Sequence, residues 1–176
     1  MKTTVGLLLI DKYEHILSCH PTRHGALQWD IVKGCIDPGE TPDETIRREF
    51  EEETSIPFSD LNGTFVDFTK LYNIDYIYVH KKKVLHGCVF LLDDTIEITK
   101  FKCNSMVNKY KCGNKILDPF PEIDAFSWIT YKEIDILHET QQRFINDVKK
   151  CYDIFNKNSL YENAQLVNSI KSNAYG

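Results

Sequence analysis

One short segment of this sequence carries an excess of negative charge that a helix can hold only at a cost. Residues 37–60 contain nine acidic side chains against two arginines, a net charge of −7, whereas the rest of the chain carries +2. Glu49, Glu52 and Glu53 are spaced i, i+3 and i+4, so they share one face of a predicted helix. Carboxylates in the last turn of a helix oppose its dipole and repel one another. These three side chains therefore need solvent or positive charge beside them.

The start of this helix is readable from its first residues. Thr41 can act as the N-cap, Pro42 suits the first helical position, and Glu44 completes a capping box. Ile46 and Phe50 flank the three glutamates and are expected to anchor the helix to a hydrophobic core. The three carboxylates are therefore expected to converge at the edge of the buried face.

A bound divalent cation would turn this cluster of charge from unfavourable to favourable. Clustered carboxylate oxygens, with no thiolate or imidazole at matching spacing, select Mg²⁺ or Mn²⁺ over zinc. The alternative is an acidic helix face exposed to solvent, which is common for runs of charge. Helix geometry alone supports these two interpretations about equally.

The residues around the helix follow a longer pattern. Gly34 is followed after five residues by Glu40 and after seven more by Arg48 and Glu49, and the pattern continues to Ile56. This spacing resembles the signature of the Nudix hydrolase family, G-x5-E-x7-R-E-U-x-E-E-x-G-U, in which U is apolar. Many specified positions at defined spacing make this a strong signal.

One position departs from the signature. Ser55 stands where the family usually has glycine, at a helix end where a left-handed residue is often needed. Serine there either costs roughly 1 kcal/mol in backbone strain or closes the turn in a different conformation, and we do not expect the replacement to remove activity by itself. The resemblance extends over residues 3–57, and residues 122–128 resemble the family's late acidic loop and final strand.

The hydrophobic pattern indicates one layered α/β domain, and the resemblance implies a Nudix-type α/β/α sandwich with a mixed central sheet. The domain is expected to span residues 1–155, followed by a polar C-terminal tail at residues 156–176 with at most a short helix. A loop or edge hairpin is expected at residues 93–121, and an amphipathic helix at residues 137–155. Strands are predicted at residues 3–10, 15–20, 27–32, 74–80, 84–92 and 125–129.

Members of the family hydrolyse a nucleoside diphosphate linked to another group, X. The resemblance therefore implies an enzyme, a Mg²⁺-dependent (or Mn²⁺-dependent) pyrophosphohydrolase that cleaves a phosphoanhydride bond in a nucleotide. Residues 16–34 are similar to the segment before the signature in members that act on dinucleoside polyphosphates or nucleotide sugars such as ADP-ribose, so these substrates are favoured. One alternative is a sensor that binds a nucleotide without cleaving it, although such a module is expected to lose signature carboxylates. Another is removal of RNA 5′ caps, which needs a basic groove that the +2 remainder supports poorly.

The resemblance also implies a set of metal ligands. Glu49, Glu52 and Glu53 would hold the ion, helped by the carbonyl oxygen of Gly34. The ion would neutralise the bridging phosphates and activate a bound water molecule. Arg48 is expected to orient carboxylates through bidentate hydrogen bonds, rather than to form only an ion pair on the helix surface.

Two carboxylates are candidates for the base that takes a proton from the attacking water. Glu52 is the first choice, and Glu122, just before the last predicted strand, is the alternative, unless it is an exposed loop acid. Lys33 and Arg23 flank the entry to the signature and are candidates for contacts with substrate phosphates. An anion that approaches an acidic site needs cations around it.

Three further side chains lie close to the signature. Trp29 is able to stack on a base or to fill the core, and its place at the start of a predicted strand favours the core. His20 and His24 are expected to be structural histidines with satisfied hydrogen bonds.

The remaining composition favours a cytoplasmic protein. Of its 176 residues 42% are hydrophobic and 27% charged, and no stretch approaches the roughly 18 consecutive apolar residues of a membrane span. The six cysteines are scattered without a CxxC pair and are expected to be reduced thiols, including Cys103 and Cys112 in one polar loop. A net charge of −5 argues against nucleic acid as a partner. The resemblance implies a nucleotide substrate instead.

Overall fold

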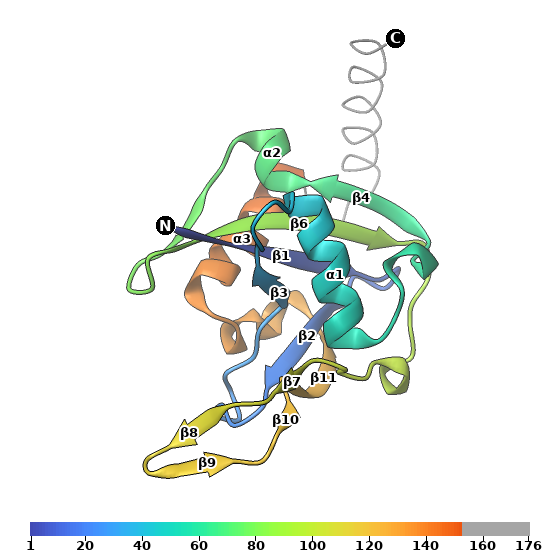
Figure 1. Ribbon diagram of the computed structural model, residues 1–176. Helices are drawn as coiled ribbons and strands as arrows, with labels where there is room; N and C mark the ends of the chain where they lie inside the picture. The colour runs from blue at the N-terminus through green and yellow to red at the C-terminus, as the bar shows by residue number, and fades with distance from the viewer. Residues whose placement is uncertain (153–176) are drawn as a thin grey trace.

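A seven-stranded sheet forms the centre of the computed structural model (Figure 1), which describes residues 1–152. Its strands are β1 (Lys2–Ile10), β2 (Ile16–Pro21), β3 (Val32–Cys35), β4 (Gly63–Asp67), β5 (Tyr76–Tyr78), β6 (Lys83–Leu92) and β11 (Ile123–Ile129). The order is β11-β2-β1-β6-β4, with β3 added to β1 and β5 added to β6. The long strands β1 and β6 pair in parallel and the other pairs are antiparallel, so the sheet is mixed, as predicted.

Helices cover both faces of this sheet. They are α1 (Pro42–Thr54), α2 (Phe68–Tyr72) and α3 (Glu139–Tyr152). Side chains alternate along β1, so Leu7 and Leu9 pack on the face covered by α1, whereas Leu8 and Ile10 pack on the face covered by α2 and α3 (Figure 1). The arrangement is an α/β/α sandwich, which confirms the predicted fold class.

Helix α1 begins where the sequence predicts and for the predicted reason. The Thr41 hydroxyl accepts a hydrogen bond from the Glu44 amide (3.2 Å), and the Glu44 carboxylate accepts one from the Thr41 amide (2.8 Å). Ile46 and Phe50 are fully buried beneath the helix. The helix is thus held at its N-terminus and along one face, which fixes the direction of its acidic side chains.

One predicted strand is wrong. Residues 27–31 form only isolated bridges, to β2 and to Leu137, and the regular strand β3 begins at Val32 and continues into a segment predicted to be a loop. Residues 32–35 pair with β1, and there Gly34 brings its backbone against Glu49 of α1. The hydrophobic pattern does not reveal this strand because a contact with α1, and not burial of apolar side chains, selects its residues.

The prediction for β5 and β6 agrees with the structure better than the prediction for residues 27–35. β5 and β6 pair as the predicted hairpin. The sequence patterns do not predict the short elements between α1 and β5, which are the 3-10 helix η1 (Phe58–Asp60), β4 and α2.

Residues 93–121 confirm the predicted edge hairpin. They begin with the 3-10 helix η2 (Ile98–Lys100) and continue as a nested pair of two-stranded ladders that projects from the sheet (Figure 1). The outer ladder joins β7 (Met106–Val107) to β10 (Phe120–Pro121), and the inner ladder joins β8 (Tyr110–Cys112) to β9 (Lys115–Leu117).

The end of the domain follows the predicted pattern. The 3-10 helix η3 (Tyr131–Ile136) precedes α3, which confirms the amphipathic helix over its described part. The predicted tail at residues 156–176 lies outside the described residues. Between residues 1 and 152, no helix has the length and apolar character needed to cross a membrane. Cys103 and Cys112 are free thiols, as expected.

Gly87→Ala tests the packing of α3 on β6. A Cβ atom at this position would lie 2.4 Å from a ring carbon of Phe144. We expect the substitution to lower the free energy of unfolding by about 1–3 kcal/mol because Phe144 must shift within a closely packed core. Urea denaturation measures the change.

Gly25→Ala is the matched control for that substitution. Its Cβ atom would meet only the flexible Gln28 side chain, at 3.4 Å. We expect a change within about 0.5 kcal/mol. Equal stability losses in the two variants would contradict the proposed packing constraint.

Candidate functional site

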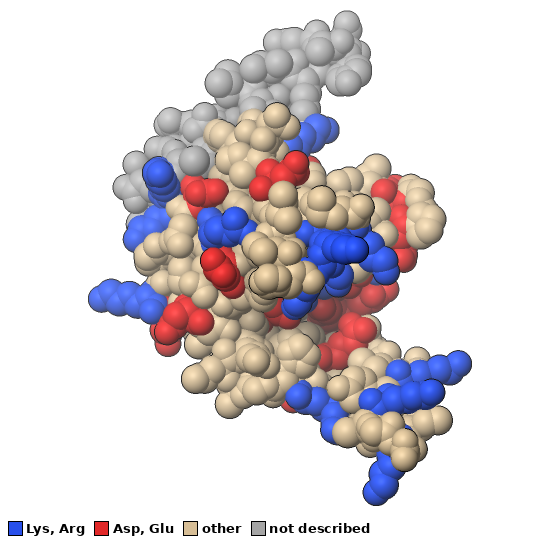
Figure 2. All heavy atoms as spheres, turned by 90° about the vertical axis from the view of Figure 1, so that its left-hand side faces the viewer, with Lys and Arg blue, Asp and Glu red and all other residues tan. Residues whose placement is uncertain are grey.

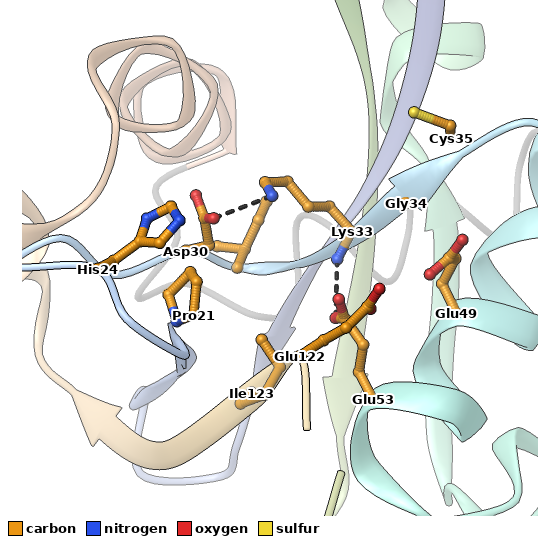
Figure 3. Close-up of a pocket in the computed structure, with 11 residues that line it drawn as sticks. Pro21, His24, Asp30, Lys33, Gly34, Cys35, Glu49, Glu53, Glu122 and Ile123 are labelled. Atoms are coloured by element: carbon orange, nitrogen blue, oxygen red, sulfur yellow. Dashed lines mark hydrogen bonds and ion pairs between the residues drawn. The ribbon is translucent and has the colours of Figure 1, made fainter. Parts of the chain in front are cut away.

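A cleft of about 340 Å³ lies between β3, α1 and the start of β11 (Figure 3). Five charged side chains belong to its wall: Asp30 just before β3, Lys33 from β3, Glu49 and Glu53 from α1, and Glu122 just before β11. Figure 2 shows acidic side chains gathered in a hollow beside the projecting hairpin. Because four of the five charged groups are acidic, the cleft attracts cations.

The position of Glu49 requires glycine at residue 34. A Cβ atom there would lie 1.8 Å from the carboxyl carbon of Glu49 and 1.9 Å from its Oε1. Glu49 is buried, and burial raises the pKa of its carboxyl group, with Arg48 opposing the shift and Glu52 adding to it. The fold therefore holds a poorly hydrated carboxylate directly against the backbone of β3.

Glu53 is more deeply buried than Glu49. Its residue is 6% exposed, and its Oε2 accepts a hydrogen bond from the Lys33 amide at 3.2 Å. Burial raises the pKa of Glu53 well above its usual value, Lys33 opposes the shift, and Glu49 adds to it. The donor that reaches Glu53 is a backbone amide and not a cation, so a cation in the cleft would stabilise this carboxylate.

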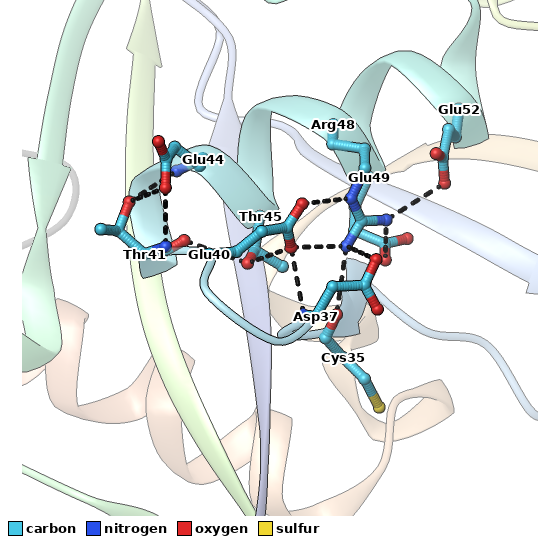
Figure 4. Close-up of polar contacts among 9 residues, drawn as sticks. All are labelled: Cys35, Asp37, Glu40, Thr41, Glu44, Thr45, Arg48, Glu49 and Glu52. Carbon is cyan, nitrogen blue, oxygen red and sulfur yellow. Dashed lines mark hydrogen bonds and ion pairs between the residues drawn. The ribbon is translucent and has the colours of Figure 1, made fainter.

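Arg48 ties several acidic groups into one network (Figure 4). Its guanidinium donates to both oxygens of Glu40 (2.7 and 2.9 Å), to Glu49 Oε1 (2.7 Å) and to Glu52 Oε2 (3.3 Å). Asp37 adds an ion pair at 3.4 Å. The hydrogen bonds from Arg48 hold the pKa of Glu40 at about 2. The guanidinium is thus placed to orient Glu49 and Glu52.

Glu52 stands apart from the two buried glutamates of α1. Its side chain is 45% exposed and does not belong to the wall of the cleft. Its backbone carbonyl accepts hydrogen bonds from the amides of Asn104 and Ser105 (2.9 and 3.1 Å), which joins the last turn of α1 to the segment before the hairpin. The structure therefore brings Glu49 and Glu53 into the cleft and leaves Glu52 beside it.

Ser55 closes α1 in the manner of the glycine that it replaces. Its φ of 62° and ψ of 12° are left-handed, as expected at this position. Its amide donates to the carbonyl of Glu51 (2.8 Å), and its hydroxyl donates to the carbonyl of Lys102. The second hydrogen bond, worth about 0.5–1.5 kcal/mol, offsets the roughly 1 kcal/mol of strain.

Glu122 reaches the cleft through an irregular start of β11. Its amide donates to the carbonyl of Ser105, and its carbonyl accepts from the amide of Thr22, both at 2.9 Å. The register between β11 and β2 then shifts between Ile123 and Ala125. These backbone contacts place Glu122 opposite the buried glutamates of α1, so it is not simply an exposed loop acid.

The structure separates the two cations that flank the signature. Lys33 lines the cleft, where burial lowers the pKa of its ammonium group but Asp30 and Glu53 raise it, and the net shift is upward. Arg23 is exposed on the turn after β2 and lies outside the wall of the cleft. Its guanidinium carbon is 5.5 Å from the ring centre of Tyr110 in the hairpin.

Asp30 is a member of the site that the sequence pattern does not identify. Its Oδ2 lies 2.9 Å from Nζ of Lys33, and its Oδ1 accepts a hydrogen bond from the Gln141 amide group at 2.7 Å. Asp30 and Lys33 are spaced i, i+3. This spacing predicts a contact between two side chains only within a helix, so the sequence does not reveal the pair. His20 pairs with Asp124 (2.5 Å), which confirms it as a structural histidine.

The carboxylates of this region suit a hard divalent cation. Glu49, Glu53 and Glu122 offer oxygen ligands in the cleft, and Glu52 adds one beside it. Ligand atoms of Glu49, Glu52 and Glu53 do not all lie within 4.8 Å of one another in this structure. Arg48 donates hydrogen bonds to Glu49 and Glu52.

A second group of potential metal ligands lies near the start of α2, where hydrogen bonds within the protein account for the positions of Asp67 and His86. Asp67, His86 and Cys88 place one ligand atom each within 4.8 Å of the others, a spacing that no other group of three attains among residues 1–152. The Asp67 carboxylate already accepts hydrogen bonds from His86 (2.7 Å) and from the amide of Lys70, which it caps at the start of α2. Oδ1 of Asp67 thus already has two hydrogen-bond donors within the protein.

Comparison of the sequence with protein families gives one result for nearly the whole described chain. A family model described as "NUDIX domain" matches residues 1–148. A search of the curated proteins by sequence finds no significant match.

Comparison with solved structures finds the same fold in proteins of low sequence identity. The dihydroneopterin triphosphate pyrophosphohydrolase of E. coli is 15% identical, with a TM-score of 0.54, and the match covers 82% of this chain and 92% of that one. An Ap4A hydrolase of C. elegans is 15% identical, with a TM-score of 0.55 and coverage of 85% and 96%. A bifunctional NMN adenylyltransferase/ADP ribose pyrophosphatase of Francisella tularensis, complexed with AMP and a Mn ion, is 18% identical, with a TM-score of 0.51 and coverage of 85% and 42%.

Gly34→Ala tests whether the contact between β3 and Glu49 builds a cation site. The added methyl group takes the place of the Glu49 carboxylate, and the flexible side chain must turn away. We expect Mn²⁺ binding, followed by EPR of the free ion, to weaken by about tenfold or more, because a ligand is displaced. The free energy of unfolding should change by less than about 1 kcal/mol, with Gly25→Ala as the control. An unchanged affinity for Mn²⁺ would remove Glu49 from the ligand set.

Proposed function

This chain belongs to the Nudix hydrolase family, and on that premise we propose that it uses Mg²⁺ or Mn²⁺ to cleave a phosphoanhydride bond in a nucleotide. Enzymes of this family are hydrolases that act on acid anhydrides. The use of the metal and the choice of a nucleotide as substrate are proposed here for this chain. The observation that carries it is the pair of buried carboxylates, Glu49 and Glu53, in a cleft beside β3. Burying two like charges together is unfavourable unless a cation joins them.

We propose Glu49, Glu52 and Glu53 as the metal ligands, together with the carbonyl oxygen of Gly34. The close approach of Gly34 to Glu49 supports this set, because it places the backbone of β3 against a buried carboxylate. A bound divalent ion supplies neutralisation of the bridging phosphates and a water molecule of lowered pKa. The exposed Glu52 side chain is free to turn from Arg48 toward the cleft, since its hydrogen bond to Arg48 is long at 3.3 Å.

Arg48 is proposed to be a positioning residue. Its bidentate contact with Glu40 leaves Nη1 directed at Glu49 and Glu52. A planar guanidinium held at one edge cannot follow the movement of a partner at the other edge, so it restricts the orientations of both carboxylates. Lysine could not make these contacts together.

Lys33 is proposed to bind a phosphate of the substrate. Its ammonium group remains charged beside Asp30 and Glu53, and it lies in the wall of the cleft. Arg23 is on the same turn as His24, which also lines the cleft. We propose that Arg23 contacts only the distant part of a long anionic substrate.

The base that accepts the proton from water is proposed to be Glu122 or Glu52. The sequence favours Glu52, which lies on the signature helix. The position of Glu122 in the wall of the cleft supports the alternative, because Arg48 engages Glu52 and the proposed metal uses its carboxylate. A base must come within hydrogen-bond reach of the water that it deprotonates.

The favoured substrates are dinucleoside polyphosphates and nucleotide sugars such as ADP-ribose. The support for them is the likeness of residues 16–34 to the corresponding segment of family members that use such substrates. The three structural neighbours named above act, by their descriptions, on dihydroneopterin triphosphate, Ap4A and ADP-ribose. These compounds share a chain of phosphates attached to a group that carries a planar ring, and the fold does not select among them.

A substrate panel tests the function directly. Purified protein with Mg²⁺ is incubated with Ap4A, ADP-ribose, nucleoside triphosphates and capped RNA, and the products are identified by chromatography and mass. We expect hydrolysis of Ap4A or ADP-ribose that EDTA abolishes and Mn²⁺ restores, because the carboxylates need the ion. Binding without turnover of any compound would identify a sensor, and preferential cleavage of capped RNA would overturn the proposed substrate class.

Glu52→Gln and Glu122→Gln separate the ligand from the base. We expect Glu52→Gln to lower kcat by about 10²-fold or more, because it removes a metal ligand. Glu122→Gln should lower kcat and flatten the acidic limb of the pH dependence of kcat, because that limb reports protonation of the base. Glu51→Gln removes the same charge from the exposed side of α1 and should stay within about twofold of the parent enzyme.

The outcomes of these variants are distinct. An unchanged kcat in Glu52→Gln would remove Glu52 from the mechanism. An acidic limb that persists in Glu122→Gln and disappears in Glu52→Gln would return the role of base to Glu52.

A further inference from the structure

Asp67, His86 and Cys88 meet at one point on the face of the sheet that α1 covers. Asp67 ends β4 and is the register partner of Cys88 in β6, and His86 precedes Cys88 by two residues in that strand. Register partners in neighbouring strands, and residues two apart in one strand, project from the same face of a sheet. None of the three belongs to the wall of the carboxylate cleft, so they form a separate group.

We propose that Asp67, His86 and Cys88 bind a zinc ion. One ligand atom from each side chain lies within 4.8 Å of the other two. Zinc holds its ligands at about 2.0–2.3 Å in tetrahedral geometry, which sets neighbouring ligand atoms about 3.3–3.8 Å apart. The three side chains therefore need only small movements to coordinate one ion. A thiolate, an imidazole and a carboxylate together suit Zn²⁺, whereas the all-oxygen ligands of the cleft suit Mg²⁺ or Mn²⁺.

Hydrogen bonds within the protein explain only part of this group. Oδ1 of Asp67 accepts from Nε2 of His86 (2.7 Å) and from the amide of Lys70 (3.0 Å). Within residues 1–152, no donor reaches Oδ2 of Asp67, and the fully buried thiol of Cys88 forms no hydrogen bond. An apolar side chain would fill the place of Cys88 without setting a polar atom against a carboxylate. One oxygen and one sulfur are thus available as ligands.

Two carboxylates lie within electrostatic range of the Cys88 thiol. Burial raises the pKa of this thiol, and the charges of Asp67 and of Asp43, in the first turn of α1, raise it further. Without a cation the thiol therefore keeps its proton. A bound zinc ion replaces that proton on sulfur and releases it to solvent, and it accepts the lone pair of neutral His86. The positive charge of the ion then compensates the carboxylates as well.

Zinc at this point joins an edge strand to the centre of the sheet. β4 is the last strand in the order β11-β2-β1-β6-β4, and Asp67 also caps α2 (Figure 1). Cys88 belongs to the buried cluster that contains Ile46 and Phe50 of the signature helix. The side chains of Asp67 and His86 are 21% and 16% exposed, so the ion reaches them from solvent and water completes its coordination. The ion is therefore a reversible cross-link between β4, α2 and the core beneath α1.

Cobalt(II) reports on the proposed site through its absorption spectrum. Co²⁺ replaces Zn²⁺ in tetrahedral sites and gives a thiolate-to-metal charge-transfer band, which carboxylate ligands do not produce. We would titrate the full chain with Co²⁺ and then add Zn²⁺, with excess Mg²⁺ present throughout so that the carboxylate cleft is not left open to the added ions. We expect the band to saturate near one Co²⁺ per chain and to disappear when Zn²⁺ displaces it. Absence of the band from the parent protein would overturn the proposal.

Serine variants identify the thiol that binds the ion. Cys88→Ser should abolish the band, because it removes the sulfur ligand of the group. Cys35→Ser is the control for the exposed thiol in the wall of the carboxylate cleft, and Cys19→Ser is the control for substitution of a fully buried cysteine. Both controls should keep the band. A band that persists in Cys88→Ser, or that is lost in Cys35→Ser, would overturn the proposal.

His86→Gln keeps the proposal testable if Cys88→Ser does not fold. The glutamine amide is able to donate to Asp67 as the imidazole does, but it does not replace imidazole as a zinc ligand. In the parent protein, free Zn²⁺ at about 100 times its Kd should raise Tm by about 5–10 °C. In His86→Gln this rise should be lost, although Tm in EDTA stays within about 2 °C of the parent value. An equal rise in both proteins would overturn the proposal.

The zinc site and the proposed hydrolase fail separately. The absorption band and the Zn²⁺-dependent rise in Tm need no turnover of a substrate, so a protein that hydrolyses nothing on the panel can still show both. Hydrolysis without either signal would sustain the hydrolase and overturn the zinc site.

Discussion

The approach of a carboxylate to the backbone of a glycine is the contact on which the site depends. Glu49 occupies the space that a side chain at Gly34 would fill, and this contact locks the C-terminal half of α1 onto β3. Glu53, one turn later, then meets the amide of Lys33. Both carboxylates lose hydration in this arrangement, so the local structure is favourable only if positive charge compensates them. Positive charge at this edge of the sheet would therefore stabilise the charged forms of both groups.

Arg48 supplies part of this positive charge and orients two of the carboxylates. Its guanidinium donates hydrogen bonds to Glu40, Glu49 and Glu52. Of the glutamates in the wall of the cleft, Glu49 is the one to which Arg48 donates in the described part of the chain. A guanidinium that holds the carboxylates in this way would orient them toward a metal ion without binding the ion itself.

Two hollows lie next to each other on one side of the sheet and share His24 and Asp30 in their walls. Charged residues of α1, β3 and the start of β11 line one hollow, and the indole of Trp29 with the chain after η3 lines the other. Lys33 and Asp30 stand between them as an ion pair. The sandwich makes this possible because strands β2, β3 and β11 end close together while their connecting segments remain free to form walls.

The sequence by itself determined the helix that carries the carboxylates, its capping box, the apolar anchors Ile46 and Phe50, and the left-handed end at Ser55. These features depend on spacing within about one or two helical turns, and helical geometry converts such spacing directly into position. Only the tertiary structure decided that β3 begins at Val32, that Glu122 and Asp30 face the cleft, and that Arg23 does not. Contacts between distant segments set those positions, and no periodicity along the chain records them.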